Sequence, residues 1–142
     1  IPLPFISLRK GPVPIFPPNR QVKSFFDKLG TTVEIKNEKL SLNFWSLSSM
    51  MAPFYKLLET LTNWLISKGI KKQDAQKYIT SLFLALSADA VNKSSKGLDV
   101  LVKNSQTPKG LNQQALNELQ KSGFFKHLVN TSNSILKRLK KV

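Results

Sequence analysis

The chain has 142 residues and a formal net charge of +14, from 22 Lys plus Arg against 8 Asp plus Glu. Its length is that of one domain, and its 41% hydrophobic and 21% charged residues are typical of a globular protein and argue against disorder. The absence of cysteine excludes disulfides, thiolate metal sites and cysteine nucleophiles. It also fits a reducing compartment, so we expect a cytoplasmic protein.

The positive charge invites a nucleic-acid role, but its distribution argues against one. Lysines are scattered along the chain, and only "KRLKKV" at the end is a basic run. We prefer a solvated lysine-rich surface and do not expect nucleic acid as a partner. No stretch reaches the roughly 18 apolar residues that span a bilayer, so no membrane is expected either. The chain begins with "IPLPFISLRKGP" and no methionine, from which we expect a fragment or a processed product.

Residues 1–36 are expected to form a strand, a helix and a strand. Six prolines lie between positions 2 and 18, where they forbid a central strand but leave "VPIF" (13–16) as a candidate edge strand. Asn19 as N-cap, Gly30 as a stop and apolar residues at helical spacing predict a helix over 19–30. The alternating "TTVEIK" (31–36) predicts the second strand.

From Asn37 onward the pattern is helical throughout. An apolar face runs over 37–51, and Pro53 stands where a first-turn proline is tolerated. Further helices are expected over 54–69, 71–93, 97–104, 111–123 and 124–142. The predicted fold class is therefore mainly α, a helical domain (37–142) preceded by a strand–helix–strand segment (1–36).

The segment "SLFLALSADA" (81–90) is apolar nearly all round. The few helices of so short a chain cannot wrap such a helix completely, and an uncovered apolar strip would promote aggregation. A two-fold partner is the commonest solution, so we expect an obligate, intertwined homodimer.

Patterns that carry chemistry are mostly missing. His127 is the only histidine and is expected to be a surface or half-buried helix residue rather than part of a catalytic triad. The eight acidic residues do not cluster, so no metal site is expected. There is no G-x-G-x-x-G and no P-loop, so these residues lack a nucleotide-binding signature.

The turn "SQTPKGLNQQAL" (105–116) remains as a candidate site. Pro108 ends the preceding helix, Gly110 tolerates a positive φ, and Asn112 is a good N-cap. Such a turn leaves backbone N–H groups unpaired, which is how proteins hold small anions. A plain helix–helix connection is the alternative on local grounds.

Taken in order, these segments resemble the C-terminal half of the Δ1-pyrroline-5-carboxylate reductase family. "IPLP" and "RKG" fall where the family has Met-Pro-Asn-Thr-Pro and Gly-Glu-Gly, and "SMMAPFY" (49–55) falls at its Ser-Gly-Ser-Gly-Pro-Ala-Tyr. "TPKGLN" (107–112) falls at the Ser-Pro-Gly-Gly-Thr-Thr turn that holds the substrate carboxylate. The resemblance implies a helical dimerisation and substrate domain over 37–142. It makes residues 1–36 the junction to a missing nucleotide-binding domain, whose sheet they would extend.

The resemblance also supplies candidate site residues. Asn112 stands where the family has a threonine that donates toward the substrate's ring nitrogen, so it is the candidate catalytic residue, although an amide has no acidic proton to transfer. Leu3 replaces the asparagine near the nicotinamide and is the candidate cofactor-binding residue. The candidate substrate-binding residues are Thr107, Lys109, Gly110, Leu111, Asn112 and Ser49.

The implied function is NAD(P)H-dependent reduction of an imine or a related small anionic substrate, as in proline biosynthesis. The parent enzyme would use NAD(P)H, and this piece alone is expected to bind no cofactor and to be inactive. Leu111 and Asn112 replace both threonines of the family turn, so the substrate stays open. The alternative is a non-catalytic helical homodimeric scaffold or interaction module. A weaker third hypothesis, resting on charge alone, is a binder of nucleic acid or anionic lipid.

Overall fold

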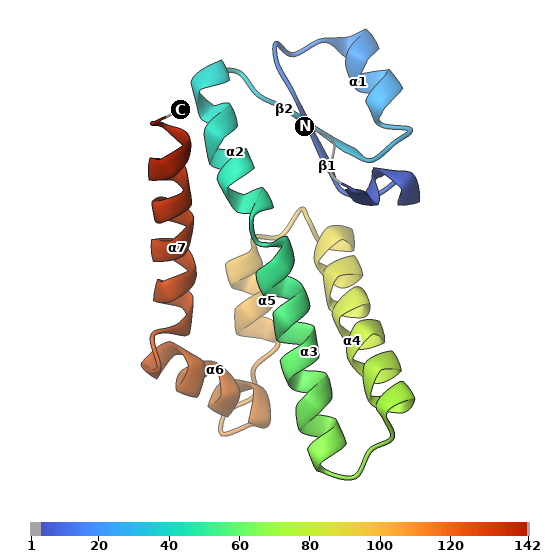
Figure 1. The fold of residues 1–142 in the computed structure, drawn as a ribbon, viewed down its shortest axis with the longest axis vertical. Coiled ribbons are helices and arrows are strands. Elements are labelled where there is room, and N and C mark those ends of the chain that lie inside the picture. Colours follow the sequence, from blue (N-terminus) through green and yellow to red (C-terminus); the bar gives the residue numbers. More distant parts are fainter. Residues whose placement is uncertain (1–3, 142) are drawn as a thin grey trace. The chain divides into compact units, whose positions relative to one another are not determined.

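The structure, a computed structural model, describes residues 4–141 (Figure 1). Its elements are η1 (Pro4–Leu8), β1 (Pro12–Ile15), α1 (Arg20–Phe26), β2 (Thr31–Glu34), η2 (Glu38–Leu40), α2 (Ser41–Ser48), α3 (Met51–Ser67), α4 (Lys72–Asn92), α5 (Leu98–Asn104), α6 (Leu111–Lys121) and α7 (Phe124–Leu139), where η denotes a 3₁₀ helix. The mainly helical fold with a preceding strand–helix–strand segment is confirmed.

Two compact units make up the described chain. The second comprises Met50–Asn130, and the first comprises the chain up to Ser49 together with the residues from Thr131 onward. The division predicted at residue 36 concerns a junction to another domain, and it stays a prediction.

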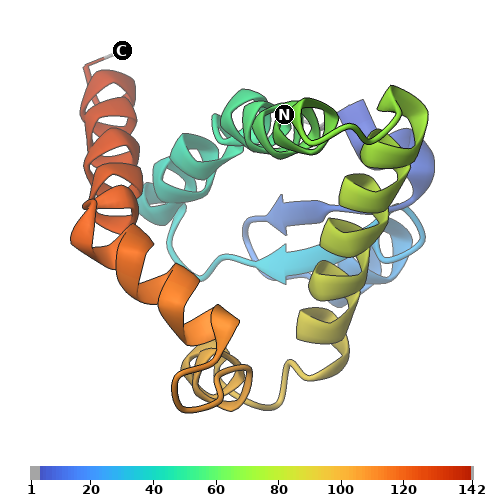
Figure 2. The same ribbon diagram turned by 90° about the horizontal axis from the view of Figure 1, so that it is seen from below.

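In the first unit, β1, α1 and β2 form a parallel strand–helix–strand. Pro12 pairs with Thr31 and Ile15 with Glu34, and Figure 2 shows the two arrows pointing the same way. The predicted N-cap is confirmed, because the Asn19 side chain accepts from the N–H groups of Gln21 and Val22, each at 3.0 Å. Ile15 and Ile35 are the described buried apolar residues of this unit.

The role predicted for Gly30 needs correction. Helix α1 ends at Phe26, four residues before this glycine, where Asp27 forms the C-cap. Gly30 instead lies where the chain enters β2, and a Cβ there would stand 2.5 Å from the Gly11 carbonyl oxygen. The glycine is therefore required by the close approach of the two strands at their beginnings, which local periodicity does not reveal.

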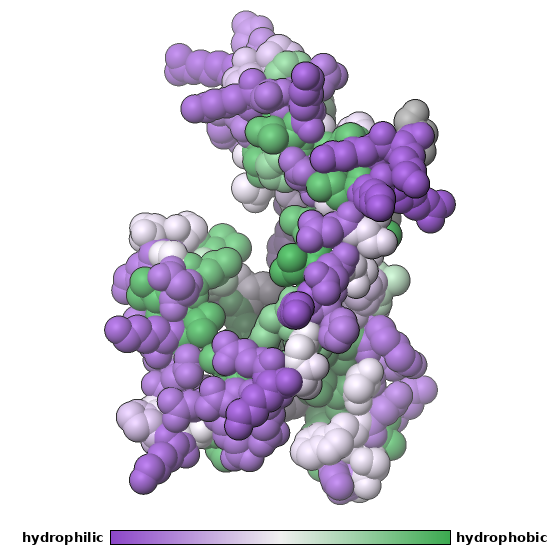
Figure 3. All heavy atoms as spheres, turned by 90° about the vertical axis from the view of Figure 1, so that its left-hand side faces the viewer, coloured by the Kyte–Doolittle hydropathy of each residue, from purple (hydrophilic) through white to green (hydrophobic). Residues whose placement is uncertain are grey.

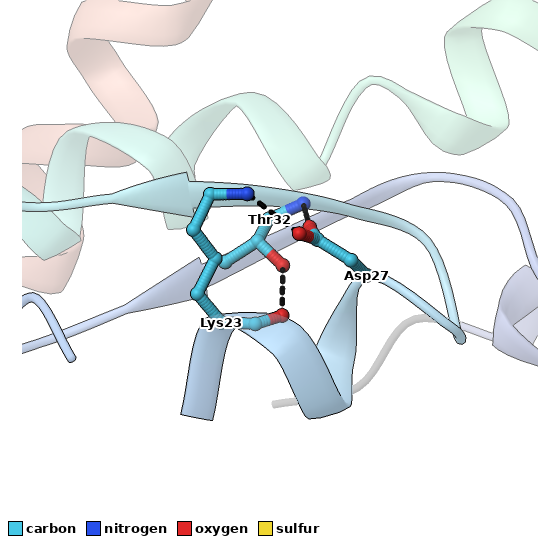
Figure 4. Close-up of polar contacts among 3 residues, drawn as sticks. All are labelled: Lys23, Asp27 and Thr32. Carbon is cyan, nitrogen blue, oxygen red and sulfur yellow. Dashed lines mark hydrogen bonds and ion pairs between the residues drawn. The ribbon is translucent and has the colours of Figure 1, made fainter. Parts of the chain in front are cut away.

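The ion pair of Lys23 and Asp27 connects the end of α1 to β2, because Asp27 also accepts a hydrogen bond from the strand residue Thr32 (Figure 4). The Lys23 ammonium donates to Asp27 Oδ2 at 2.6 Å, and the Thr32 N–H donates to Asp27 Oδ1 at 3.3 Å. The Thr32 hydroxyl reaches the Lys23 carbonyl oxygen at 3.4 Å. The hydrogen bond from Lys23, followed by that from Thr32, lowers the pKa of the Asp27 carboxyl, and the bond to Asp27 raises the pKa of Lys23.

In the second unit, α3 and α4 pack side by side as a hairpin. Helix α3 begins two residues before Pro53, which occupies its first turn as predicted. After α3, Gly69 has a φ of 90°, the left-handed conformation that ends a helix at glycine. The Phe54 and Phe83 rings meet edge to face at 6.2 Å between centroids.

Much of the apolar surface of these helices is uncovered. On α4, Leu84 is 63% and Leu86 57% exposed, although the helix buries Ala75 and Ile79. Helices α5, α6 and α7 contain no buried residue. The chain exposes 11743 Å², whereas two compact bodies of the same total mass would expose about 9,000 Å² together. On the face drawn in Figure 3, hydrophobic residues (green) lie at the surface among hydrophilic ones (purple).

We predict that Asp27→Asn lowers the stability of the protein and weakens its acid dependence. A carboxyl whose pKa is depressed in the folded state stabilises the fold above its unfolded pKa and loses that contribution as pH falls through the folded pKa. The loss of unfolding free energy caused by Asp27→Asn should therefore be largest at neutral pH and become smaller on acidification below about pH 4. Urea midpoints at pH 7 and pH 3, at equal protein concentration, measure it.

Asp89→Asn is the matched control, since Asp89 pairs with Lys93 at 2.7 Å within a single stretch of chain at the end of α4. Asp89→Asn should lower the stability less than Asp27→Asn does, because the Asp89–Lys93 pair does not connect its helix to a strand. Equal effects of the two variants at both pH values would contradict the role given to Asp27.

Candidate functional site

The candidate turn connects α5 to α6 within the second unit. The Gly110 N–H donates to the Thr107 carbonyl oxygen at 2.8 Å, closing a four-residue turn with Pro108 second and Lys109 third. Lys109 has a φ of 62°, as the third residue of a type II turn requires. The sequence-based assignment is thus corrected, because Gly110 has a φ of −78° and is the N-cap of α6, a role predicted for Asn112.

Two side chains hold this turn in place. The Asn112 Nδ2 donates to the Ser105 carbonyl oxygen at 2.8 Å, and the Gln113 Oε1 accepts from the Lys109 N–H at 2.9 Å. One amide hydrogen of Asn112, the candidate catalytic residue, is therefore used in a hydrogen bond that stabilises the turn. Sequence reasoning missed Gln113, although a Gln at the third position of a helix often reaches back to the preceding backbone.

Gly110 lies against Thr107. A Cβ at Gly110 would stand 2.1 Å from the Thr107 Oγ1 and 3.0 Å from its carbonyl oxygen. The Thr107 hydroxyl would have to rotate away, while the carbonyl that closes the turn would still be crowded. Thr107 and Gly110 are therefore in mutual contact, as residues shaping one small site would be.

The remaining sequence-predicted residues are placed as follows. Leu111, the first residue of α6, is 85% exposed, and Lys109 is exposed beside it. Ser49 belongs to the first unit, where it ends α2 and its hydroxyl donates to the Ser46 carbonyl oxygen at 2.6 Å. Leu3 lies outside the described residues. His127 is exposed on α7, as predicted.

The turn offers hydrogen-bond donors and one cation. The N–H groups of Lys109 and Gly110 are already used, so the anion-binding capacity rests on the first-turn N–H groups of α6 and on the Lys109 ammonium. Neither Asn112 nor Leu111 supplies an acidic proton, so these two residues cannot protonate a bound ligand, whereas the Lys109 ammonium carries a proton that it could transfer. Between Pro4 and Lys141, no group of three or more His, Asp or Glu residues could hold a metal ion.

A family model described as pyrroline-5-carboxylate reductase dimerisation matches residues 42–142. The chain belongs to this family. The match contains the candidate turn and every helix from α3 to α7. None of the curated protein sequences compared with the chain matches it.

Solved structures of the same family have a similar fold. The chain is similar to a pyrroline-5-carboxylate reductase (proC) from Coxiella burnetii, with a TM-score of 0.80 and 17% identity over 95% of this chain and 53% of that one. It is similar to the Plasmodium falciparum pyrroline carboxylate reductase with NADP bound, with a TM-score of 0.73 and 20% identity over 92% and 52%. For the 1-pyrroline-5-carboxylate reductase from Streptococcus pyogenes the TM-score is 0.78, with 21% identity over 96% and 55%. The chain therefore spans about half the length of these relatives.

Two residues of the described chain have an unusual left-handed backbone conformation without being glycine. The described non-glycine residues with positive φ are Arg9, at 53°, and Lys109. Glycine adopts this conformation without strain, whereas a residue that carries a Cβ does not.

No helix among the described residues combines the length and the apolar character that crossing a membrane requires.

We predict that Lys109→Gly is neutral or stabilises the protein by up to about 1 kcal/mol. A left-handed conformation costs a residue with a Cβ roughly 1–2 kcal/mol, and the extra unfolded-state freedom of glycine offsets part of the gain. Lys121→Gly is the matched control: its place in the last turn of α6 is helical, so the same substitution should destabilise by up to about 1 kcal/mol. Denaturant midpoints at fixed protein concentration measure both, and equal losses would refute the prediction.

Proposed function

We propose that this chain is the dimerisation and substrate-binding domain of an NAD(P)H-dependent reductase similar to pyrroline-5-carboxylate reductases, acting in the cytoplasm. It forms a homodimer, and the turn at Thr107–Asn112 receives the anionic group of a small substrate. The reduction requires a nucleotide-binding domain, so the chain by itself is inactive. NAD(P)H serves the whole enzyme.

The family match over residues 42–142 carries this proposal. The uncovered apolar faces supply independent support for dimerisation, because Leu84 and Leu86 lie on different sides of α4 and one neighbouring helix cannot cover both. The donors at the start of α6 and the Lys109 charge support an anionic ligand. The NADP bound to the Plasmodium falciparum relative supports the cofactor of the whole enzyme.

The turn favours a second candidate function as well. Leu111 and Asn112 stand where the family has two threonines, and the Asn112 amide braces the turn through Ser105. A site without these two hydroxyl donors but with an ordered backbone turn fits a homodimeric scaffold without catalysis. The natural sequence preceding Ile1 separates the two candidates. A strand followed by G-x-G-x-x-G and a helix supports the reductase, and a start codon close upstream supports the scaffold.

We predict that the 142-residue chain binds neither NADPH nor NADH with micromolar affinity, because it contains no phosphate-binding glycine motif. Isothermal titration calorimetry with both cofactors measures this. Micromolar binding would refute the assignment of cofactor recognition to a separate domain.

We also predict a homodimer that buries more than about 2,000 Å² in total, as permanent interfaces do. Light scattering at micromolar concentration should give twice the chain mass of 16.0 kDa, and a mass of one chain would refute the prediction. Leu82→Asp, which puts a charge into the apolar surface of α4, should give insoluble or unfolded protein. Gln76→Asp adds the same charge at an exposed polar position of α4 and should leave a soluble dimer.

A further inference from the structure

The turn that joins α3 to α4 is exposed along its whole length. Every residue from Ile66, near the end of α3, to Asp74, in the first turn of α4, is exposed to solvent, and so is Trp64. Figure 1 shows the turn at the free end of the hairpin. We call residues 66–74 together with Trp64 the hairpin tip.

Hydrogen bonds fix the backbone of the hairpin tip. The Gly69 N–H donates to the Ile66 carbonyl oxygen at 3.0 Å, and the Ile70 N–H donates to the Leu65 carbonyl oxygen at 3.2 Å. With Gly69 at a φ of 90°, this is the Schellman motif, in which the residue after the glycine commonly packs back on the helix. Ile70 nevertheless remains 44% exposed. An ordered turn therefore holds an isoleucine largely in solvent.

The hairpin tip combines this isoleucine with an exposed tryptophan. Trp64 is 58% exposed, and the Lys68 ammonium lies 5.8 Å from the centroid of its ring. Tryptophan prefers the boundary between water and hydrocarbon, and lysine can cover apolar surface with its stem while its charge stays in water. Exposed Trp64 and Ile70 beside a lysine are therefore suited to such a boundary.

The charge of the hairpin tip is positive. Between residues 60 and 88 the chain has four lysines, and Asp74 is the one acidic residue there. Among the described residues, no ion pair is formed by Lys68, Lys71 or Lys72. Lys71 is the N-cap of α4, without a side-chain hydrogen bond, and Lys72 is its first residue. Cations are unfavourable at that end of a helix, so folding stability does not explain these two lysines.

We infer that the hairpin tip binds the surface of an anionic lipid bilayer. Ile70 and Trp64 enter the boundary between water and hydrocarbon, and Lys68, Lys71 and Lys72 contact the negatively charged headgroups. An acidic protein segment would complement the lysines, but it would not account for the exposed apolar side chains of Ile70 and Trp64.

A surface contact of this kind needs no helix that spans the bilayer. The sequence-based expectation of no membrane partner considered only a spanning segment, and the inference replaces it. The hairpin tip also lies apart from the leucines expected in the dimer interface, because Leu82 follows Lys72 by ten residues, about 15 Å along α4. The inference is independent of the proposed function, since a reductase and a scaffold would carry the same hairpin tip.

Co-sedimentation of the 142-residue chain with lipid vesicles tests the inference at about 0.15 M ionic strength. The chain should bind vesicles of phosphatidylcholine with about one third phosphatidylserine, and should not bind vesicles of phosphatidylcholine alone. Lys71→Glu/Lys72→Glu should lower the partition coefficient at least about 20-fold, since each lysine near an anionic surface contributes roughly fivefold. The variant should fold as well as the wild type, because acidic residues are favourable at the start of a helix.

Lys96→Glu/Lys126→Glu is the matched control, with the same change of net charge at two exposed lysines of the second unit outside the hairpin tip. It should lower the partition coefficient by no more than about threefold, because charges farther than about 8 Å from the headgroups are largely screened. Equal losses in the two double variants, or no binding of the wild type to the mixed vesicles, would overturn the inference.

Tryptophan fluorescence tests whether the hairpin tip enters the lipid. Trp45→Phe leaves Trp64 as the only tryptophan, and its emission should be quenched by mixed vesicles whose acyl chains are brominated. Trp64→Phe, which keeps Trp45 on α2, is the control and should show no quenching. Quenching of Trp45 alone would place the contact elsewhere and overturn the inference. Binding of the wild type to soluble polyglutamate but not to mixed vesicles would assign the hairpin tip to an acidic protein and also overturn it.

Discussion

Apolar helix surface that one chain cannot cover is the constraint on which this structure depends. Helices α5, α6 and α7 contain no buried residue, and α4 exposes leucines while its own buried residues face α3. Burial of such surface is the main source of folding free energy, at about 25 cal/mol per Å². A partner that covers this surface would therefore add to the stability of the second unit, as expected for a member of a dimerisation family. Its stability would then vary with protein concentration.

The candidate site depends on this scaffold in a different way. Its shape is set by the backbone, through the Thr107–Gly110 turn and the braces from Asn112 and Gln113. Backbone donors at the start of α6 do not depend on the chemistry of the side chains, so the proposed anion binding would persist when neighbouring side chains are exchanged for others than proline. The left-handed conformations of Arg9 and Lys109 illustrate the same separation, because the fold imposes them on residues that pay a strain for adopting them.

The strand–helix–strand unit is stabilised by interactions within the chain, in contrast to the helices whose apolar surface is uncovered. Its buried residues are Ile15, at the end of β1, and Ile35, directly after β2, and the Ile35 N–H donates to the Ile15 carbonyl oxygen. Its ion pair and its N-cap join residues that are at most four positions apart in the sequence. Interactions over such short sequence separations form without a second chain.

The sequence by itself determined where the helices lie, because an amphipathic period, the Asn19 cap, the Pro53 position and the Gly69 stop are local signals. It also predicted a dimer partner and, through collinear motifs, the family. Only the tertiary structure decided that Gly30 is required by contact with Gly11, that Lys109 and not Gly110 adopts the positive φ, and that Asn112 is a brace. Those features arise from contacts between a residue and backbone that has already turned back toward it. Periodicity along the chain carries no record of such contacts, since it reports only which side of an element is apolar.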